Sequence, residues 1–326
     1  MLPTTFEDIF HRSACILGEG ALIERLRRDS PFELDPFIVN SGFIYEEPTR
    51  KAMESIYRQY LDAGARHDLP LLLSTPTWRA SRQRIADAGL ADRDVNGDNF
   101  RFLDDLRKSY GNYSQKVVIC GLMSCKGDAY DQSQALETDA AHAFHAWQAQ
   151  KLAEAGVDFL KAATLPALDE AIGLAKAMAD TGMSYVVSFV VRPEGTLLDN
   201  TPLKDAVTAI DAATAPNPFV FMANCTHASN FRSALLHKVN SSPLVRDRMK
   251  GLLANTAALT PEELDNADSL VEEEPEVFGR DLAALHKDLG TRILGGCCGT
   301  DQRHIGDLAA RLAASENMMK YSNRGD

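Results

Sequence analysis

The sequence lacks any apolar run long enough to cross a membrane. Its longest apolar stretches, such as VVSFVV at 186–191, have the length of a β-strand, whereas a spanning helix needs about 18 apolar residues or more. The N-terminal segment also lacks the apolar core of a signal peptide, because acidic and polar residues occupy that place. We therefore expect a cytoplasmic protein that has no membrane partner.

Basic residues are also in deficit. The sequence has 34 Lys and Arg residues against 46 Asp and Glu residues, which gives a formal net charge of −12. Such a chain lacks the positive field that neutralises phosphate groups, so neither nucleic acid nor an anionic membrane is an expected partner. The charge favours solubility, and small molecules remain the expected ligands.

Cysteine is scarce, with six residues in 326 and none of them in a CxxC pair. Without a secretion signal, these cysteines are expected to be reduced thiols used for packing, metal binding or catalysis. Length alone would suggest about two domains. Because no polar or low-complexity linker interrupts the chain, we predict a single domain over residues 1–326.

Short apolar runs alternate with amphipathic stretches along the whole chain, which is typical of a parallel sheet covered by helices. Eight such units favour closure into a (β/α)8 TIM barrel, an α/β fold whose active site lies at the carboxyl ends of the strands. An open doubly wound sheet is the alternative, although GEGALIER at 18–25 lacks the final glycine of a dinucleotide-binding motif. The predicted strands are 14–19, 69–75, 117–123, 158–164, 184–191, 219–225, 250–256 and 292–297.

Apolar residues at three- and four-residue spacing predict the helices between these strands. The predicted helices include 47–63, 138–155, 167–181, 202–213 and 276–289. Several helical stretches should end at a glycine, where the chain turns towards the next strand. These glycines are Gly64, Gly89, Gly156, Gly182 and Gly290. Two stretches interrupt the alternation, and we expect a long loop at 20–46 and an acidic loop at 257–275.

The strongest local signal is GGCCGT at 295–300, where two adjacent cysteines lie at the end of the eighth predicted strand. ANCTH at 223–227 places a third cysteine at the end of the sixth. Because the carboxyl ends of all barrel strands lie on one face, Cys225, Cys297 and Cys298 could converge there. The flanking glycines would permit the turn that aims both adjacent thiols at one point. Three thiolates suit Zn²⁺ with its fourth tetrahedral position open, which is typical of catalytic zinc.

Other roles remain open for the cysteines. Unpaired cysteines are often small buried hydrophobes, and we expect that role for Cys15 and Cys120, which lie inside strand runs. Cys125, in the loop after the third strand, could pack in the same way or reach the catalytic face. A vicinal disulfide between Cys297 and Cys298 is an alternative to metal binding.

These motifs carry a resemblance to a known family. The GGCCGT motif with His-Ile at 304–305, the pair Asn224–Cys225 and the eight-unit layout are similar to the zinc-dependent homocysteine S-methyltransferases. That family includes the betaine–homocysteine and S-methylmethionine–homocysteine methyltransferases and the homocysteine domain of cobalamin-dependent methionine synthase. The similarity spans nearly the whole chain, and it implies that Cys225, Cys297 and Cys298 are the zinc ligands.

The chemistry of methyl transfer agrees with these residue types. A thiol with a pKa of about 8.5 is mostly protonated near neutral pH, whereas a thiol bound to Zn²⁺ is deprotonated. We therefore expect a zinc-bound thiolate, that of homocysteine, to displace a methyl group in line from a sulfonium or ammonium donor and give methionine. No catalytic side chain is needed beyond the metal-bound thiolate. The alternatives are zinc-dependent alkyl transfer to a different thiol, and a non-catalytic zinc- or thiol-binding protein.

Two positions depart from the family pattern where the homocysteine amino group is held. Ala163 stands where family members commonly carry an acid, and Glu19 stands for the usual aspartate near the first strand. Because alanine cannot hold an ammonium, Glu19, Asp128 or another acid must take its place, or the acceptor is a different thiol. We expect Glu19 and Ala163 at the substrate, together with Trp78, whose ring could stack on a methylated cation or serve packing.

Other candidates carry weaker signals. His142 and His145 lie three residues apart in a predicted helix and could bind a metal, but their mid-helix position favours packing or surface roles. His227 could support Cys225 or be an ordinary loop residue. Arg79 and Arg192 could pair with a substrate carboxylate, although a solvated charge is the default interpretation for both.

Overall fold

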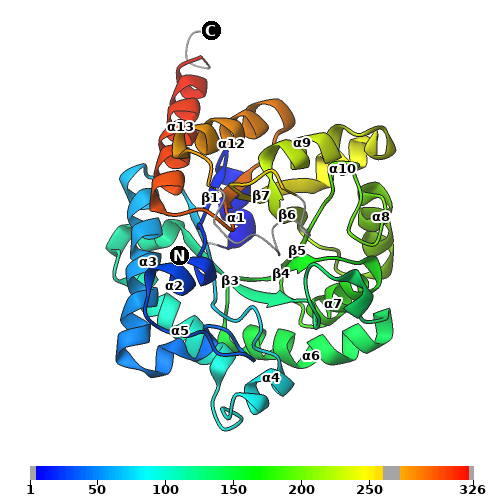
Figure 1. Ribbon diagram of the computed structural model, residues 1–326. Coiled ribbons are helices and arrows are strands. Elements are labelled where there is room, and N and C mark those ends of the chain that lie inside the picture. The colour runs from blue at the N-terminus through cyan, green and yellow to red at the C-terminus, as the bar shows by residue number, and fades with distance from the viewer. Residues whose placement is uncertain (1–4, 260–271, 323–326) are drawn as a thin grey trace.

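The computed structural model describes residues 5–259 and 272–322, with side chains described up to residue 315. Eight parallel strands form a closed barrel in the order β1 to β8 (Figure 1). The barrel closes where β1 pairs with β8, with Ile16 opposite Ile293. This pairing confirms the predicted (β/α)8 barrel and excludes the open sheet. The strands are β1 Ile16–Gly18, β2 Leu71–Ser74, β3 Val117–Ser124, β4 Phe159–Leu165, β5 Tyr185–Phe189, β6 Val220–His227, β7 Met249–Asn255 and β8 Ile293–Gly296.

Helices surround the barrel and cover the outer faces of its strands (Figure 1). No helix in the described part of the chain is long and apolar enough to span a membrane. The α-helices are α1 Phe6–Arg12, α2 Ile23–Asp29, α3 Glu47–Arg66, α4 Arg82–Asp87, α5 Val95–Lys108, α6 Thr138–Ala155, α7 Leu168–Ala179, α8 Leu203–Ala213, α9 Ala228–Leu236, α10 Pro243–Arg248, α12 Pro275–Leu289 and α13 Gln302–Ser322. The short 3₁₀ helices are η1 Ser41–Tyr45, η2 Gly111–Lys116, η3 Gln132–Gln134 and η4 Lys238–Asn240.

The prediction of a long loop at 20–46 is wrong, because α2 and η1 form within it. Tertiary contacts hold η1 in place: the Ser41 hydroxyl donates to the Pro76 carbonyl at 2.6 Å, and Asn99 donates to the Ser41 carbonyl at 2.9 Å. Local sequence carries no signal for partners so distant in the chain. Of the acidic loop predicted at 257–275, residues 260–271 lie outside the described residues.

The prediction that a helix ends at Gly64 is also wrong, since α3 continues to Arg66. Gly64 lies inside the helix, where a Cβ atom would collide with the Tyr113 hydroxyl, so its small size permits close packing. The left-handed turn residue after this helix is Asp68, with φ 56°. By contrast, Gly156 and Gly290 cap α6 and α12 as predicted, with φ 86° and 68°.

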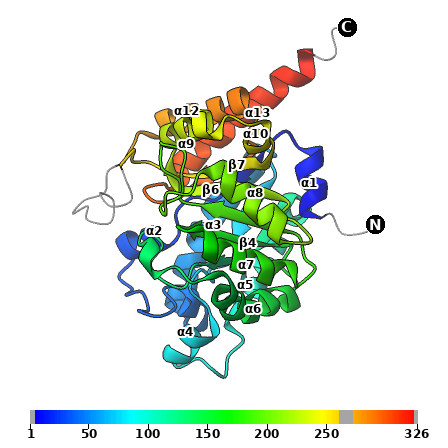
Figure 2. The ribbon, with the colours of Figure 1, turned by 90° about the vertical axis from the view of Figure 1, so that its right-hand side faces the viewer.

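The inside of the barrel changes from apolar to polar towards the carboxyl ends of the strands. At the amino end, α1 closes the barrel (Figure 2). Its Phe6 stacks on Phe159 of β4, with 4.0 Å between ring centroids. The next inward-facing position lies two residues further along each strand, and in several strands a polar residue occupies it. We call Ser74, Lys161, Ser188 and Asn224 the polar layer, because they follow the inward Leu72, Phe159, Val186 and Met222 by two residues each. The cysteine motifs lie just beyond this layer.

Candidate metal centre

Three cysteine sulfurs converge at the carboxyl ends of the strands, as the sequence predicts. Cys225 lies in β6, and Cys297 and Cys298 follow β8 directly. Their sulfur atoms all lie within 4.8 Å of one another, and those of Cys225 and Cys297 are 2.7 Å apart although 72 residues separate them in the chain. None of the six cysteines forms a disulfide, so the vicinal disulfide is not present in this structure.

A break in the regular strand geometry aims the Cys225 side chain. Cys225 has φ 51°, and the pairing of β6 with β7 shifts register between Asn224 and Thr226. Such a conformation in a residue other than glycine costs about 1–3 kcal/mol and occurs mostly where the surroundings enforce it. A bulge of this kind redirects side chains that would otherwise alternate between faces. It lets Asn224 and Cys225 contact each other, with the amide Nδ2 3.4 Å from Sγ.

The Asn224 side chain supplies the enforcing contacts. Its Oδ1 accepts from the Thr164 backbone N–H at 2.8 Å and from the Ser188 hydroxyl at 2.7 Å, and its Nδ2 donates to Thr164 Oγ1 at 2.8 Å. Thr164 itself has φ 60°, beside a register shift between β4 and β5. Asn224 therefore ties β4, β5 and β6 together directly beneath Cys225. Sequence reasoning found this residue only as half of a motif and missed its structural role.

A tight turn after β8 presents Cys297 and Cys298. The Cys297 N–H donates to the Ala254 carbonyl at 2.7 Å, and the Thr256 N–H donates to the Cys298 carbonyl at 3.2 Å, so β7 holds both cysteines. Gly299 follows with φ 84°, and a Cβ atom there would collide with the Thr256 side chain. This geometry confirms that a glycine permits the turn which brings both thiols to one side.

The electrostatics of the three sulfurs favour a bound cation. Hydrogen bonds from Cys297 and Cys298 lower the pKa of Cys225 well below its ordinary value. The same contacts with Cys225 raise the pKa values of Cys297 and Cys298 well above theirs. Because one thiolate makes further ionisation unfavourable, three thiolates at this separation need a positive charge between them. The donor set fits zinc: tetrahedral Zn–S bonds of about 2.3 Å place sulfurs about 3.8 Å apart, which a small rotation of Cys225 or Cys297 would reach.

A tyrosine from the loop after β3 covers the sulfur cluster. The Tyr130 side chain lies beside Cys225, and the charge of that sulfur, followed by burial, raises the pKa of Tyr130 well above its ordinary value. The fully buried Glu170 of α7 holds the loop by accepting from the backbone N–H groups of Lys126 at 2.6 Å and Leu136 at 3.2 Å. His145 binds the same carboxylate at 2.9 Å, which confirms its packing role. No motif marks Tyr130 in the sequence.

Glu19 directly follows β1, and its role at the substrate stays a prediction. Burial raises its pKa to about 7, and the charge of Lys161 opposes that rise. Its Oε1 accepts from the Ser74 backbone N–H at 3.0 Å, whereas Oε2 is buried and has no hydrogen-bond partner among the described residues. Ala163 is buried in β4, opposite Ser124 of β3. Lys161 was not singled out from the sequence.

Trp78 and Arg79 lie in the loop after β2 and contact each other. The Arg79 guanidinium lies 4.4 Å from the centroid of the Trp78 ring, and the rest of the ring packs against the core. Arg79 also donates to the backbone carbonyls of Lys126 and Gly127, at 3.1 and 2.5 Å. Arg79 therefore connects the loop after β2 to the loop after β3 and covers one side of the Trp78 indole.

Most of the weaker candidates have structural partners. Cys15 and Cys120 are buried as predicted, and Cys125 is buried with its pKa raised to about 11 by burial. His142 pairs with Asp180 on the surface at 2.7 Å. The His227 ring accepts from the Ser229 backbone N–H at 3.2 Å and so caps α9. His142 and His145 therefore do not share a metal site.

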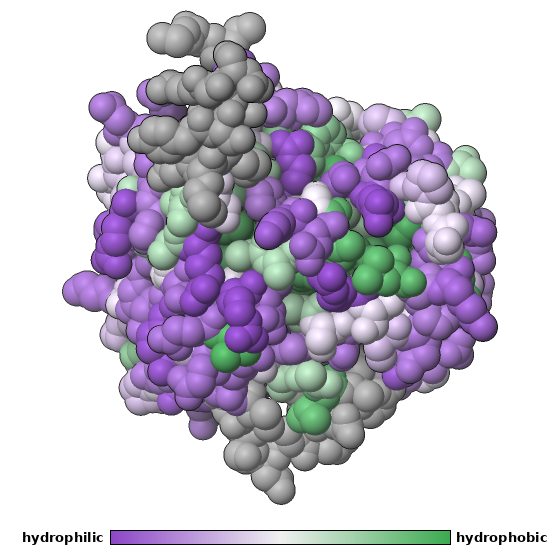
Figure 3. All heavy atoms as spheres, turned by 90° about the horizontal axis from the view of Figure 1, so that it is seen from above, coloured by the Kyte–Doolittle hydropathy of each residue, from purple (hydrophilic) through white to green (hydrophobic). Residues whose placement is uncertain are grey.

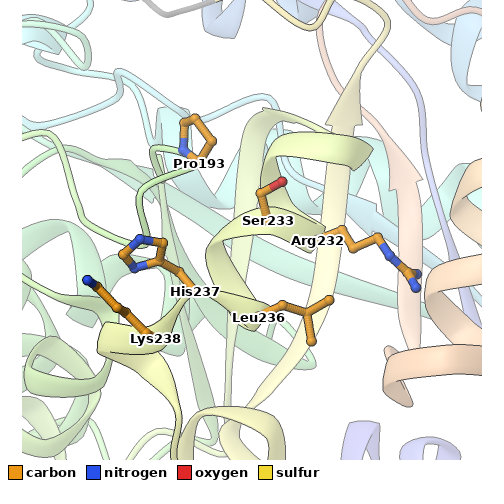
Figure 4. A pocket seen from close by; sticks show the side chains of 6 residues that line it. All are labelled: Pro193, Arg232, Ser233, Leu236, His237 and Lys238. Carbon is orange, nitrogen blue, oxygen red and sulfur yellow. The ribbon is translucent and has the colours of Figure 1, made fainter.

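A second group of possible ligands, Glu272, Asp301 and His304, lies near the start of α13. Arg303 forms ion pairs with both carboxylates, and both ring nitrogens of His304 bind other atoms of the chain. All three residues of the group therefore already have partners within the chain. A hollow beside α9 and η4 contains none of the cysteines, and its Arg232 points away from His237 and Lys238 (Figure 4).

Comparison with known proteins identifies relatives over nearly the whole chain. Residues 16–312 match the homocysteine S-methyltransferase family. The rat betaine–homocysteine S-methyltransferase 1 is 24% identical over 93% of this chain and 74% of its own length. The homocysteine S-methyltransferase YbgG of Bacillus subtilis is 23% identical over 90% of this chain and 93% of its own. The metallated crystal form of the Escherichia coli homocysteine methyltransferase MmuM superposes with a TM-score of 0.74 at 20% identity, over 93% of this chain and 98% of that one.

Proposed function

Because the chain belongs to the homocysteine S-methyltransferase family, we propose that it is a zinc-dependent S-methyltransferase acting through the sulfur cluster. It transfers a methyl group from a sulfonium or quaternary ammonium donor to the thiolate of a small acceptor. Family membership supports homocysteine as the acceptor, with methionine as the product. Cys225, Cys297 and Cys298 are the residues that would hold the zinc ion.

The convergence of three cysteine sulfurs within 4.8 Å is the observation that carries this proposal. Three thiolates leave the fourth tetrahedral position of zinc open for a further ligand, which is the arrangement of catalytic sites. A bound zinc ion would keep the acceptor sulfur deprotonated at neutral pH. The solved MmuM structure in its metallated form supports metal binding by this fold.

The surrounding residues orient the cluster and limit its access to water. Asn224 fixes the direction of Cys225 through its contacts with Thr164 and the sulfur itself. Tyr130 covers Cys225 from the loop after β3. The methyl donor would approach from the carboxyl face of the barrel, where reaction requires the donor methyl in line with the acceptor sulfur. Among these residues no side chain has to act as a general base.

The test is methyl transfer by the zinc-loaded protein with S-methylmethionine, betaine and S-adenosylmethionine as donors and a panel of thiols as acceptors. We expect transfer with at least one pair, and loss of both zinc and activity on Cys225→Ala. Cys125→Ala is the matched control, because Cys125 is also buried and its sulfur hydrogen-bonds Ser124 and Gly127. Zinc retention without transfer to any thiol would instead identify a non-catalytic zinc-binding protein.

A different thiol acceptor is the second candidate function, and Ala163 favours it. The buried methyl group of Ala163 offers no charge to a substrate amine. Transfer to another thiol but not to homocysteine, in the same panel, would establish this alternative.

A further inference from the structure

A lysine lies inside the barrel, in the layer beneath the sulfur cluster. Lys161 occupies an inward position of β4 and is only 1% exposed. It follows the inward Phe159 by two residues and precedes Ala163 by two, so all three side chains share the interior face of the strand. A lysine is almost never fully buried unless its charge is paired. The barrel must therefore provide a partner for this ammonium.

Glu19 and Ser74 provide that partner. The Lys161 ammonium donates to Ser74 Oγ at 2.8 Å, and the Ser74 backbone N–H donates to Glu19 Oε1 at 3.0 Å. Lys161 and Glu19 thus both hydrogen-bond Ser74. Burial raises the pKa of Glu19, and the positive charge of Lys161 offsets part of that rise. Glu19 is the carboxylate beside Lys161 in the polar layer, and its other oxygen has no hydrogen-bond partner among the described residues.

Backbone and side-chain hydrogen bonds connect Glu19 and Lys161 to the residues next to the three cysteines. The Glu19 carbonyl accepts from the Gly296 N–H at 2.8 Å, and Gly296 immediately precedes Cys297. On the other side, Lys161 is three residues before Thr164, which Asn224 connects to Cys225. We call Glu19 and Lys161 the floor of the site, because they lie in the polar layer, just before the strand ends that carry the three sulfurs.

Two other acids on the carboxyl face accept hydrogen bonds from the backbone, and a third, Glu273, has one buried oxygen, Oε2, without a hydrogen-bond partner among the described residues. Glu24 accepts from the Gly299 N–H, and Asp128 accepts from the Tyr130 N–H at 2.8 Å. Glu273 lies 3.6 Å from the His227 ring nitrogen Nε2, at the edge of the cluster. On the floor itself the carboxyl group of Glu19, whose pKa burial raises to about 7, lies beside the ammonium of Lys161. A substrate ammonium placed there would meet no net negative charge.

We propose that Lys161, connected to Glu19 through Ser74, provides from the chain itself the positive charge beside that carboxyl group, so that the preferred acceptor is a thiol without an amino group. This inference rests on the proposed methyl transfer and specifies the acceptor class of its second candidate, a thiol other than homocysteine: short alkyl thiols with a neutral or carboxylate tail. Homocysteine would bring a second ammonium to a floor that is already neutral. Binding it would require either desolvating that charge without a partner or displacing Lys161 from Glu19.

The test compares homocysteine with 4-sulfanylbutanoate, which has the same thiol, chain length and carboxylate but no amine. A charge-assisted hydrogen bond to an ammonium changes binding by about 10- to 150-fold. We expect the zinc-loaded wild type to favour 4-sulfanylbutanoate by about ten-fold or more, both in dissociation constant and in kcat/KM with the best donor. In Lys161→Met, which frees Glu19, this preference should fall by at least about ten-fold or reverse.

Two controls separate specificity from a general loss of structure. Lys151→Met removes an exposed lysine of α6 and should leave the preference unchanged. Glu19→Gln in the Lys161→Met background should abolish the gain of homocysteine, because no carboxylate remains for its amine. Zinc content and thermal unfolding identify any variant that fails to fold, and the wild-type comparison stands without variants.

Equal or better use of homocysteine by the wild type would overturn the inference, as would a preference that Lys161→Met does not change. In the first case, loss of homocysteine binding in Glu273→Gln would identify the carboxylate that holds the amine instead. The dissociation constants are measured without a methyl donor. A protein that binds 4-sulfanylbutanoate selectively but transfers no methyl group would therefore contradict the proposed function and still support the role of Lys161.

Discussion

Removal of the Asn224 side chain should loosen the metal site and destabilise the barrel together. Asn224→Ala leaves two buried donors, the Thr164 N–H and the Ser188 hydroxyl, without their acceptor. Each unsatisfied donor costs about 1–3 kcal/mol, so we expect the free energy of unfolding to fall by about 2–6 kcal/mol. Because the same side chain orients Cys225, the dissociation constant for zinc should rise by about 10- to 100-fold, as for other residues that position ligands.

The assay combines urea unfolding of the zinc-loaded protein with zinc competition against a chromophoric chelator. Asn240→Ala is the matched control, since Asn240 is equally buried, accepts from the Lys204 N–H at 3.0 Å and donates to two carbonyls at 2.8 Å. It should lose comparable stability and keep its zinc affinity. If both variants bound zinc as tightly as the wild type, Asn224 would have no role in positioning Cys225, and the reasoning from its contacts would be refuted.

Three further predictions follow from single residues. Burial raises the pKa of Glu19 from 4.5 to about 7, so between these pH values the folded state binds more protons than the unfolded state. The free energy of unfolding should therefore fall by up to about 3 kcal/mol as pH rises from about 4.5 to 7. Glu19→Gln should remove this pH dependence in urea unfolding, and parallel profiles for wild type and variant would contradict it. Glu170→Ala, which leaves the Lys126 and Leu136 N–H groups without their acceptor, should speed hydrogen exchange across 126–136 and lower activity, whereas the exposed Glu154→Ala should change neither. Gly299→Ala should release zinc, because the added Cβ would collide with Thr256. The control Gly111→Ala has a similar φ of 58° but no heavy atom within 4 Å of the added Cβ, so it should keep zinc and lose only about 1 kcal/mol of stability. Zinc retention by Gly299→Ala would show that the turn tolerates a side chain.

The sequence predicts the barrel well because its strands are buried on both faces. Such strands appear as continuous apolar runs, and all eight overlap the observed ones; the sixth, predicted at 219–225, is β6 Val220–His227. The cysteine site follows from the same reasoning, since strand ends of a barrel meet on one face whatever their separation in the chain. The exact bounds of α6 were predicted because a left-handed Gly156 ends it.

The parts that the sequence does not reveal depend on register and on tertiary contacts. Lys161 and Asn224 matter because they face inward at one level of the barrel, which only the pairing of neighbouring strands determines. Thr164 and Cys225 have positive φ values that residue propensities do not favour. Tyr130 reaches Cys225 from a loop whose position depends on the distant Glu170. Each of these residues belongs to the site through contacts between elements far apart in the chain.

The central claim is that Cys225, Cys297 and Cys298 bind one catalytic zinc ion that accepts the substrate thiol. Zinc K-edge X-ray absorption of the purified protein tests it most directly. We expect about one zinc per chain with about three sulfur ligands at about 2.3 Å and one lighter atom, and about four sulfurs after addition of an accepted thiol. The variant with all three cysteines changed to alanine should contain no zinc. Full zinc content in that variant, or a ligand shell of nitrogen and oxygen unchanged by thiols, would contradict the account.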